Sequence, residues 1–286
     1  MITETVTLNG HPFFLRRWGD PSLPPLLMLH GFPEYSGAWE DLAPLLSHRF
    51  HCVAPDQRGY GQSWAPDGVE NYVVPELVGD MSALIDHLGG KVTLLGHDWG
   101  AAVAYGLAFF HPEKIEKLII LNGVHPGPFQ RELAKGGAQT EASQYMTFLR
   151  RDGSEDILAA NAFEKLHSLF SAKMDTGWLE GPRKADYEKA WTGRLKTMIH
   201  WYRASPVKVP LPGEAIDVPA IPPGRMMVRC PHLLIWGQRD TALLPESNAG
   251  LEDFAPDLTR VEVADADHWI CHQQPARVAN EILAWA

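Results

Sequence analysis

The chain has 286 residues, of which 45% are hydrophobic and 21% charged, as in a globular protein with one large domain or a core that carries an insertion. The net charge of −10 disfavours a surface for nucleic acids or acidic membranes, because phosphate groups would be repelled. Apolar runs are too short to cross a bilayer, and three scattered cysteines predict neither a disulfide framework nor a structural zinc site.

The first residues lack the basic start and apolar block of a signal peptide, so we expect a cytoplasmic protein. Strand-like and helix-like segments then alternate up to residue 123, and Asn9-Gly10 predicts the turn of a first hairpin. The expected strands are residues 6–10, 11–19, 24–31, 50–56, 91–97 and 115–123, and the expected helices are residues 38–47, 74–89 and 99–112. Nearly continuous apolar strands between helices indicate a parallel sheet covered on both faces.

The pattern becomes helical from about residue 124 to residue 203, with helix-like segments at 141–151, 154–173 and 183–205. A proline-rich connection follows at residues 205–224. Alternation then returns, with strands expected at 231–240 and 259–265 and helices at 245–255 and 274–286. We therefore expect residues 1–124 and 225–286 to form one α/β core, with residues 125–224 as a helical insertion and its proline-rich return.

The stretch "LLGHDWGA" places Asp98 between Gly96 and Gly100, where a strand turns sharply into a helix. Glycines permit such a tight turn, and the backbone amides at the start of a helix favour a negative charge. An ionised carboxylate can attack carbon and form an ester on the enzyme. The alternative is structural, since aspartate is also a preferred N-cap residue.

Two further segments supply the groups that would hydrolyse such an ester. Asp240 follows one expected strand and His268 follows the last one, in the order nucleophile, acid, base. The backbone N–H groups of Phe32 and Trp99 are candidates for an oxyanion hole. His30 and Pro33 are interpreted as structural, the proline on a cis bond. We expect no metal site and no cofactor.

These residues resemble the α/β-hydrolase superfamily, and within it the branch of epoxide hydrolases and haloalkane dehalogenases. The segments that show this resemblance are "HGFPE", "DQRGYGQS", "GHDWGA", "WGQRD" and "DADHW". The resemblance implies a mostly parallel eight-stranded sheet with helices on both faces and a helical cap inserted after the sixth strand. Asp267 departs from the family, which more often has glycine there, and its charge could raise the pKa of His268.

Epoxide hydrolases carry two cap tyrosines that bind the epoxide oxygen. "ASQYMTFLR" and "IHWYRAS" are similar to those segments, which implies that Tyr145 and Tyr202 are catalytic. Each tyrosine also shares a helical face with apolar residues, so core packing is the structural alternative. His200 stands where the family usually has asparagine.

The resemblance implies an epoxide hydrolase that acts on a small apolar epoxide with water. A haloalkane or haloacid dehalogenase is the close alternative, with Trp178, Trp191 or Trp201 as a second halide donor beside Trp99. A non-catalytic binding protein would predict an incomplete set of these residues. Glu34 either positions the hydrolytic water or lies on the surface. The oligomeric state stays open, a homodimer being one option.

Overall fold

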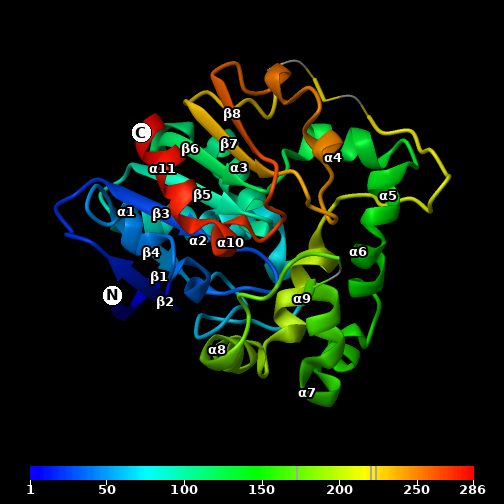
Figure 1. The fold of residues 1–286 in the computed structure, drawn as a ribbon, viewed down its shortest axis with the longest axis horizontal. Coiled ribbons are helices and arrows are strands. Elements are labelled where there is room, and N and C mark those ends of the chain that lie inside the picture. Colours follow the sequence, from blue (N-terminus) through cyan, green and yellow to red (C-terminus); the bar gives the residue numbers. More distant parts are fainter. Residues whose placement is uncertain (172, 220, 223) are drawn as a thin grey trace.

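Eight strands form one sheet in the computed structural model, which describes residues 1–171, 173–219, 221–222 and 224–286 (Figure 1). Ala172 of the expected helical insertion and Ala220 and Pro223 of its proline-rich return lie outside the described residues. The spatial order is β1-β2-β4-β3-β5-β6-β7-β8, antiparallel at β1–β2 and β2–β4 and parallel elsewhere. The strands are β1 Ile2–Leu8, β2 His11–Trp18, β3 Pro25–Leu29, β4 His51–Pro55, β5 Val92–His97, β6 Ile115–Leu121, β7 His232–Gly237 and β8 Leu258–Val263.

Alternation along the strands builds two apolar layers, one on each face of the sheet. In β3, Leu27 and Leu29 belong to the layer that contains α2 and α3, whereas Leu26 and Met28 belong to the layer that contains α1 and α11. Successive strand side chains point to opposite faces, so a continuously apolar strand fills both layers. The predicted parallel sheet with two covered faces is therefore confirmed.

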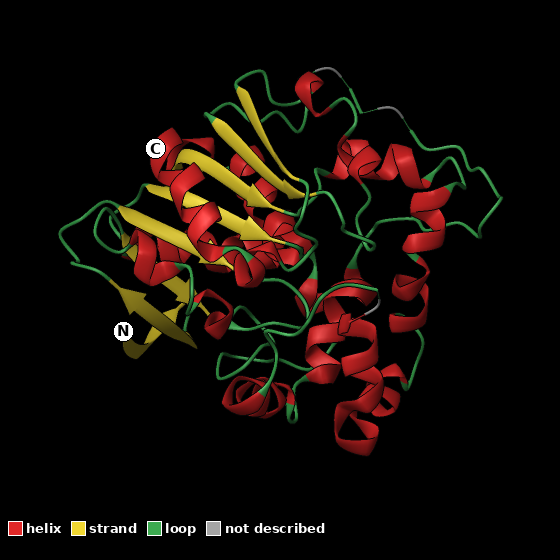
Figure 2. Ribbon diagram, viewed as in Figure 1, coloured by secondary structure: helices red, strands yellow, loops and turns green. Residues whose placement is uncertain are grey.

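Eleven α-helices lie in the described residues, and six of them follow β6 and precede β7 in the chain. These six lie together beyond the ends of the central strands, whose arrowheads point toward them (Figure 2). The helices are α1 Ala43–Leu46, α2 Val74–His87, α3 Trp99–Phe110, α4 Pro126–Leu133, α5 Ala138–Ala142, α6 Gln144–Leu149, α7 Ser154–Ser171, α8 Gly181–Trp191, α9 Leu195–Ala204, α10 Ile270–Gln273 and α11 Pro275–Trp285. None of these helices combines the length and the apolar composition that a bilayer span needs.

Several expected helices are shorter than their patterns suggested. Residues 38–47 contain only the end of a 3-10 turn and α1, because Pro44 has no N–H and starts a new helix. The expected helix at 183–205 is split into α8 and α9 next to Gly193, whose φ of 73° leaves the helical region. Residues 245–255 form two 3-10 turns separated by Gly250 at φ 75°. The expected helix ends were therefore wrong at residues 38–47 and 183–205, and the helix expected at residues 245–255 was wrong, because only 3-10 turns form there.

Candidate active site

The turn from β5 into α3 raises Asp98 at the end of the sheet that faces the six inserted helices. Its backbone has φ 51° and ψ −120°, and its side chain makes no capping hydrogen bond to α3. A Cβ at Gly100 would come within 2.0 Å of the carbonyl oxygen of Leu29, and a Cβ at Gly96 within 2.7 Å of the carbonyl oxygen of Gly100. Only glycines fit these two positions, so the turn is as tight as the sequence predicted, and Asp98 is not an N-cap by side-chain hydrogen bonding.

The carboxylate of Asp98 is held on one side and open on the other. The backbone N–H of Phe32 donates to Oδ1 at 2.7 Å, and the backbone N–H of Trp99, the first residue of α3, helps to lower the pKa of the same carboxyl. A Cβ at Gly31 would lie 2.3 Å from the Cβ of Asp98, so glycine allows this close approach of the loop. Burial raises the pKa of Asp98 above its ordinary value, against the opposing charge of His268. The carboxylate is therefore more basic than an exposed one, which favours nucleophilic attack.

His268 lies between two carboxylates, as the sequence predicted. Its Nε2 is 3.7 Å from Oδ2 of Asp98, and its Nδ1 is 2.8 Å from Oδ2 of Asp240. The same Asp240 oxygen accepts 2.8 Å from Nδ2 of Asn122, at the end of β6, and its other oxygen accepts from the backbone N–H of Leu243. Asn122 was not predicted from the sequence, although a polar residue directly after a buried strand was the available signal.

The charges around His268 decide its protonation. Burial alone would lower its pKa, but the carboxylates of Asp240 and Asp98 outweigh burial and raise it to about 9. Asp267 was expected to contribute, yet its carboxylate accepts from the backbone N–H groups of Trp269 and Asp175. The pKa of His268 is thus raised chiefly by Asp240 and Asp98, with a smaller effect of Glu34. Asp267 instead ties the loop of the histidine to the segment after α7.

Two tyrosines face Asp98 from the inserted helices. Tyr145 on α6 and Tyr202 on α9 both line the cavity that contains Asp98 and His268, and their ring centroids lie 6.1 Å apart. Burial raises the pKa of both phenols, and the charge of Asp98 adds to this. Both hydroxyls therefore keep their protons and can donate hydrogen bonds. Arg150, the residue directly after α6, joins the two helices, because its guanidinium donates to the carbonyl oxygen of Tyr202 on α9 at 3.0 Å.

The cavity has a volume of about 800 Å3, and its lining is mostly apolar, with Glu141, Ser168 and Lys173 among its polar members besides the groups around Asp98. Its apolar walls come from α7, from α5 and from the loop after β7. The described residues of these walls include Ala138, Ala142, Leu166, Leu169, Phe170 and Leu244. Such a cavity suits an apolar molecule whose reactive group lies between Asp98 and the tyrosines.

Hydrogen bonds to Gln57 fix the loop from His30 to Pro33. The ring of His30 accepts from the backbone N–H of Gln57 at 3.2 Å, and the side chain of Gln57 donates back to the carbonyl oxygen of His30 at 2.6 Å. Burial lowers the pKa of His30, which keeps the ring neutral and able to accept. The Phe32–Pro33 bond is cis, as predicted. The structural interpretation of His30 and Pro33 is therefore supported.

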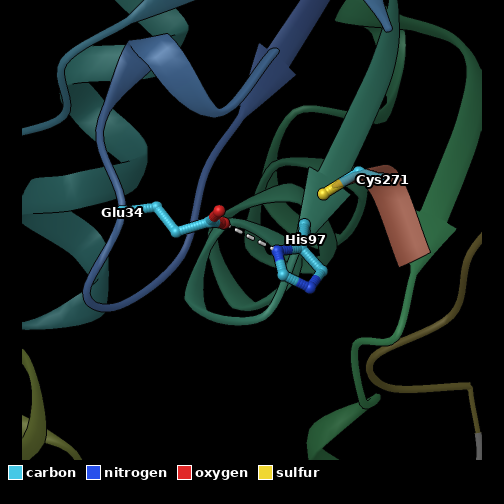
Figure 3. Close-up of side chains that lie close together, drawn as sticks. All are labelled: Glu34, His97 and Cys271. Carbon is cyan, nitrogen blue, oxygen red and sulfur yellow. Dashed lines mark hydrogen bonds and ion pairs between the residues drawn. The ribbon is translucent and has the colours of Figure 1, made fainter. Parts of the chain in front are cut away.

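Glu34 is 1% exposed, so the surface position considered for it is wrong. It forms a cluster with His97 and Cys271 whose donor atoms lie within 4.8 Å of one another (Figure 3). This set does not fit a metal ion, because both nitrogens of His97 already face acceptors, namely Oε2 of Glu34 at 2.9 Å and the carbonyl oxygen of His268 at 2.8 Å. Burial also raises the pKa of the Cys271 thiol well above its ordinary value, which disfavours the thiolate that a metal needs.

His268 and His272 are four residues apart, a spacing that helical metal ligands use. Their rings do not converge, since Nδ1 of His268 contacts Asp240 and Nε2 of His272 contacts Oε1 of Glu34 at 2.6 Å. This pair of histidines is therefore committed to two different carboxylates.

Comparison with known proteins agrees with this geometry. A family model described as alpha/beta hydrolase fold matches residues 24–275. The chain is 31% identical over 287 residues to the AB hydrolase superfamily protein YfhM of Bacillus subtilis, covering 99% of this chain and 96% of that protein. It is 30% identical to epoxide hydrolase 4 of Mus musculus, covering 97% of this chain and 76% of that protein.

Solved structures give the same result. An epoxide hydrolase of Bacillus megaterium, in complex with an inhibitor, superposes with a TM-score of 0.87 at 30% identity over 99% of both chains. A structure from a study of novel epoxide hydrolases in metagenomes from hot environments has a TM-score of 0.91 at 34% identity, over 100% of this chain and 98% of that one. The chain therefore belongs to the alpha/beta hydrolase superfamily, in the part of it that includes epoxide hydrolases.

Proposed function

We propose that this protein is an epoxide hydrolase that converts an apolar epoxide into a vicinal diol through an ester on Asp98. One observation carries the proposal. Oδ1 of Asp98 is held by the N–H of Phe32, while Oδ2 lies 3.7 Å from His268 in a cavity that Tyr145 and Tyr202 also line. Nucleophile, base and two proton donors thus border one apolar space.

In the first half-reaction, Oδ2 of Asp98 attacks an epoxide carbon and the ring C–O bond breaks. The electron pair of that bond stays on the epoxide oxygen, which Tyr145 and Tyr202 stabilise by hydrogen bonds. One of the two tyrosines transfers its proton to this oxygen and becomes a tyrosinate. Each preorganised donor of this kind contributes about 3 kcal/mol at the transition state. The product is a hydroxyalkyl ester of Asp98, and the negative charge of the carboxylate is gone.

In the second half-reaction, water adds to the carbonyl carbon of the ester while one of its protons passes to Nε2 of His268. Asp240 keeps the imidazole oriented, because its Oδ2 accepts from Nδ1. The developing negative charge falls on Oδ1, which accepts from the N–H of Phe32, and the N–H of Trp99 is the second proposed donor of this oxyanion hole. Collapse of this intermediate releases the diol oxygen, which takes the proton from His268. The second proton of the water, left on the Asp98 carboxyl, returns to the tyrosinate and restores both groups.

The dehalogenase alternative receives less support, because a leaving halide needs convergent N–H donors in the cavity. Among the described residues that line the cavity, none of the three candidate cap tryptophans is present. The indole N–H of Trp191 donates to the carbonyl oxygen of Pro33, that of Trp201 donates to the carbonyl oxygen of Arg58, and Trp178 stacks on His272. A paired tyrosine site therefore fits epoxide opening better than halide binding.

We also propose that residues 125–224 act as the cap of this active site, on a core of residues 1–124 and 225–286. The contribution of Tyr145 and Tyr202 from within that range supports the division. Three free cysteines, Cys52, Cys230 and Cys271, are consistent with a reducing, cytoplasmic location. The homodimer stays a prediction.

A single turnover in 18O-labelled water tests whether an ester forms on Asp98. If Asp98 supplies the attacking oxygen, the first diol released contains no 18O and the label enters Asp98, whereas direct attack by water would label the diol. The variant His268→Ala should lose turnover by about 10³-fold. It should also accumulate the Asp98 ester in mass spectra, and Asp98→Ala should form no adduct. A labelled first diol, or full turnover by Asp98→Ala, would overturn the proposal.

A further inference from the structure

The carboxylate of Glu34 accepts hydrogen bonds from three different parts of the chain. Its Oε2 accepts from Nδ1 of His97 at 2.9 Å, and its Oε1 accepts from Nε2 of His272 at 2.6 Å and from the hydroxyl of Tyr187 at 3.2 Å. His97 precedes Asp98 at the end of β5, His272 lies on α10, and Tyr187 lies on α8. Glu34 is thus the hub of what we call the Glu34 network, which consists of Glu34, His97, His272 and Tyr187.

The Glu34 network is buried and charged. Glu34 and Tyr187 are 1% exposed, His97 is fully buried and His272 is 7% exposed. Burial alone would raise the pKa of Glu34, but the hydrogen bonds from His272 and His97 lower it well below the ordinary value. A buried carboxylate needs such donors, because an ionised carboxyl without them is strongly destabilised.

The network reaches the base of the proposed reaction through His97. Nε2 of His97 donates to the backbone carbonyl oxygen of His268 at 2.8 Å, and the two rings lie 4.7 Å apart. Nδ1 of His97 faces the carboxylate of Glu34, so both ring nitrogens lie against oxygen acceptors. The imidazole of His97 is therefore locked between Glu34 and the peptide of His268.

The network also reaches the inserted helices. The indole of Trp178 stacks on the ring of His272 with 3.6 Å between centroids and 9° between planes, and the hydroxyl of Tyr187 lies 3.4 Å from Nε2 of His272. His272 is consequently fixed from three sides, by Glu34, Trp178 and Tyr187. It follows His268 by four residues in the same loop and helix.

We propose that His272 is a positioning residue for ester hydrolysis. It acts through Glu34 and His97, which hold the backbone of His268 in place. Tyr187 connects this network to the inserted helices, because its hydroxyl donates to Glu34 from α8. This inference rests on the proposed ester mechanism. It concerns the second half-reaction, because formation of the ester uses Asp98 and the two tyrosines rather than the base. Misplacement of a general base by about 1 Å is enough to slow its step up to about 100-fold.

The test separates the two half-reactions by rapid quenching and mass spectrometry of the Asp98 ester. His272→Leu removes the donor to Glu34, and we expect ester hydrolysis to slow about 10-fold or more, while ester formation changes less than about 2-fold. His272→Gln keeps an N–H donor and should restore hydrolysis to within about 3-fold of the natural protein. Tyr187→Phe, which loses only the hydroxyl, should give a smaller slowing of the same step and remains informative if His272→Leu does not fold.

A matched control is His232→Leu, which removes another buried histidine, one that contacts Tyr105 and the carbonyl oxygen of Leu118 instead. It should lower thermal stability without changing the ratio of the two rates. The inference is wrong if His272→Leu hydrolyses the ester at the natural rate, if both rates fall together, or if His272→Gln is as slow as His272→Leu. Absence of any Asp98 ester in the natural protein would instead overturn the proposed function.

Discussion

Two walls of the cavity differ in chemistry. We call Asp98, His268 and the adjacent Asp240 the core wall. We call Tyr145, Tyr202 and the apolar residues of α7 the cap wall. Groups of the core wall lie at strand ends and carry charges that compensate one another, with His268 between two carboxylates. Groups of the cap wall lie on helices and are neutral, since burial raises the pKa of both phenols. In the proposed reaction, bond formation thus takes place at the edge of the sheet, and proton donation comes from the inserted segment.

Within the core wall, two aspartates show how the surroundings divide the roles of one residue type. The pKa of Asp98 is raised, because burial outweighs its hydrogen bonds, whereas the pKa of Asp240 is lowered by the charge and hydrogen bond of His268 despite burial. Asp240 also accepts from Asn122 and from the N–H groups of Ala242 and Leu243. Asp98 keeps one oxygen for attack, while Asp240 has none to spare.

Removal of both phenols should have the largest effect, because it leaves the core wall complete and the cap wall without donors. We expect the double variant Tyr145→Phe, Tyr202→Phe to form the Asp98 ester about 10³-fold more slowly, and each single variant to lose less. Stopped-flow or quench measurements of ester formation check this. Tyr105→Phe is the control, a buried tyrosine that contacts His232 outside the cavity. Natural rates of ring opening in the double variant would exclude the tyrosines from catalysis.

The pH dependence tests the charges of the core wall. His268 has a pKa of about 9 while Asp98 is ionised, and a base must be neutral to accept a proton. Ester formation removes the charge of Asp98, so the pKa of His268 should fall, and the acid limb of ester hydrolysis should lie below pH 9. Below that limb the rate should drop 10-fold for each pH unit, about 1.4 kcal/mol.

Asp240→Asn sharpens this prediction, because it removes the charge that contributes most to raising the pKa of His268. The acid limb of ester hydrolysis should then move to lower pH by about 1–3 units. The maximal rate should also fall, since Nδ1 loses its orienting carboxylate. A limb that stays in place would mean that Asp240 does not control the protonation of the base.

Local patterns made much of the core wall predictable from sequence. Gly96, Asp98 and Gly100 encode the turn by themselves, because close backbone approach requires glycine at two nearby positions. Asp240 and His268 were expected close to Asp98 because the loops that follow the carboxyl ends of parallel strands meet at one edge of the sheet. Tyr145 and Tyr202 could be named only through family resemblance, since helical periodicity alone interprets them as packing residues.

The contacts of the Glu34 network could not be predicted from the sequence. Glu34 contacts Tyr187, 153 positions later, and His272, 238 positions later, and no spacing in the chain records such contacts. The break between α8 and α9 depends on one left-handed glycine, which a helical pattern conceals. Long-range polar contacts and helix ends therefore required the structure, because tertiary packing decides them rather than local preference.

The smallest effect should come from the partly exposed ion pair between the inserted helices and the core. Arg183 on α8 contacts both oxygens of Asp41, at 2.8 and 2.7 Å, but each side chain is about a third exposed, at 31% and 32%. Solvent screens such a pair, so Arg183→Ala should lower the free energy of unfolding by only about 0.5 kcal/mol and leave turnover within about 2-fold.

Chemical denaturation with and without 1 M NaCl measures this, and the difference between Arg183→Ala and the natural protein should shrink in salt. Tyr187 lies on the same helix, four residues along, yet Tyr187→Phe should slow ester hydrolysis without removing any ion pair. If Arg183→Ala slowed hydrolysis more than Tyr187→Phe, the exposed pair rather than the Glu34 network would seat the cap wall. The opposite ranking follows from burial, since a hydrogen bond to a buried carboxylate is not screened by water or salt.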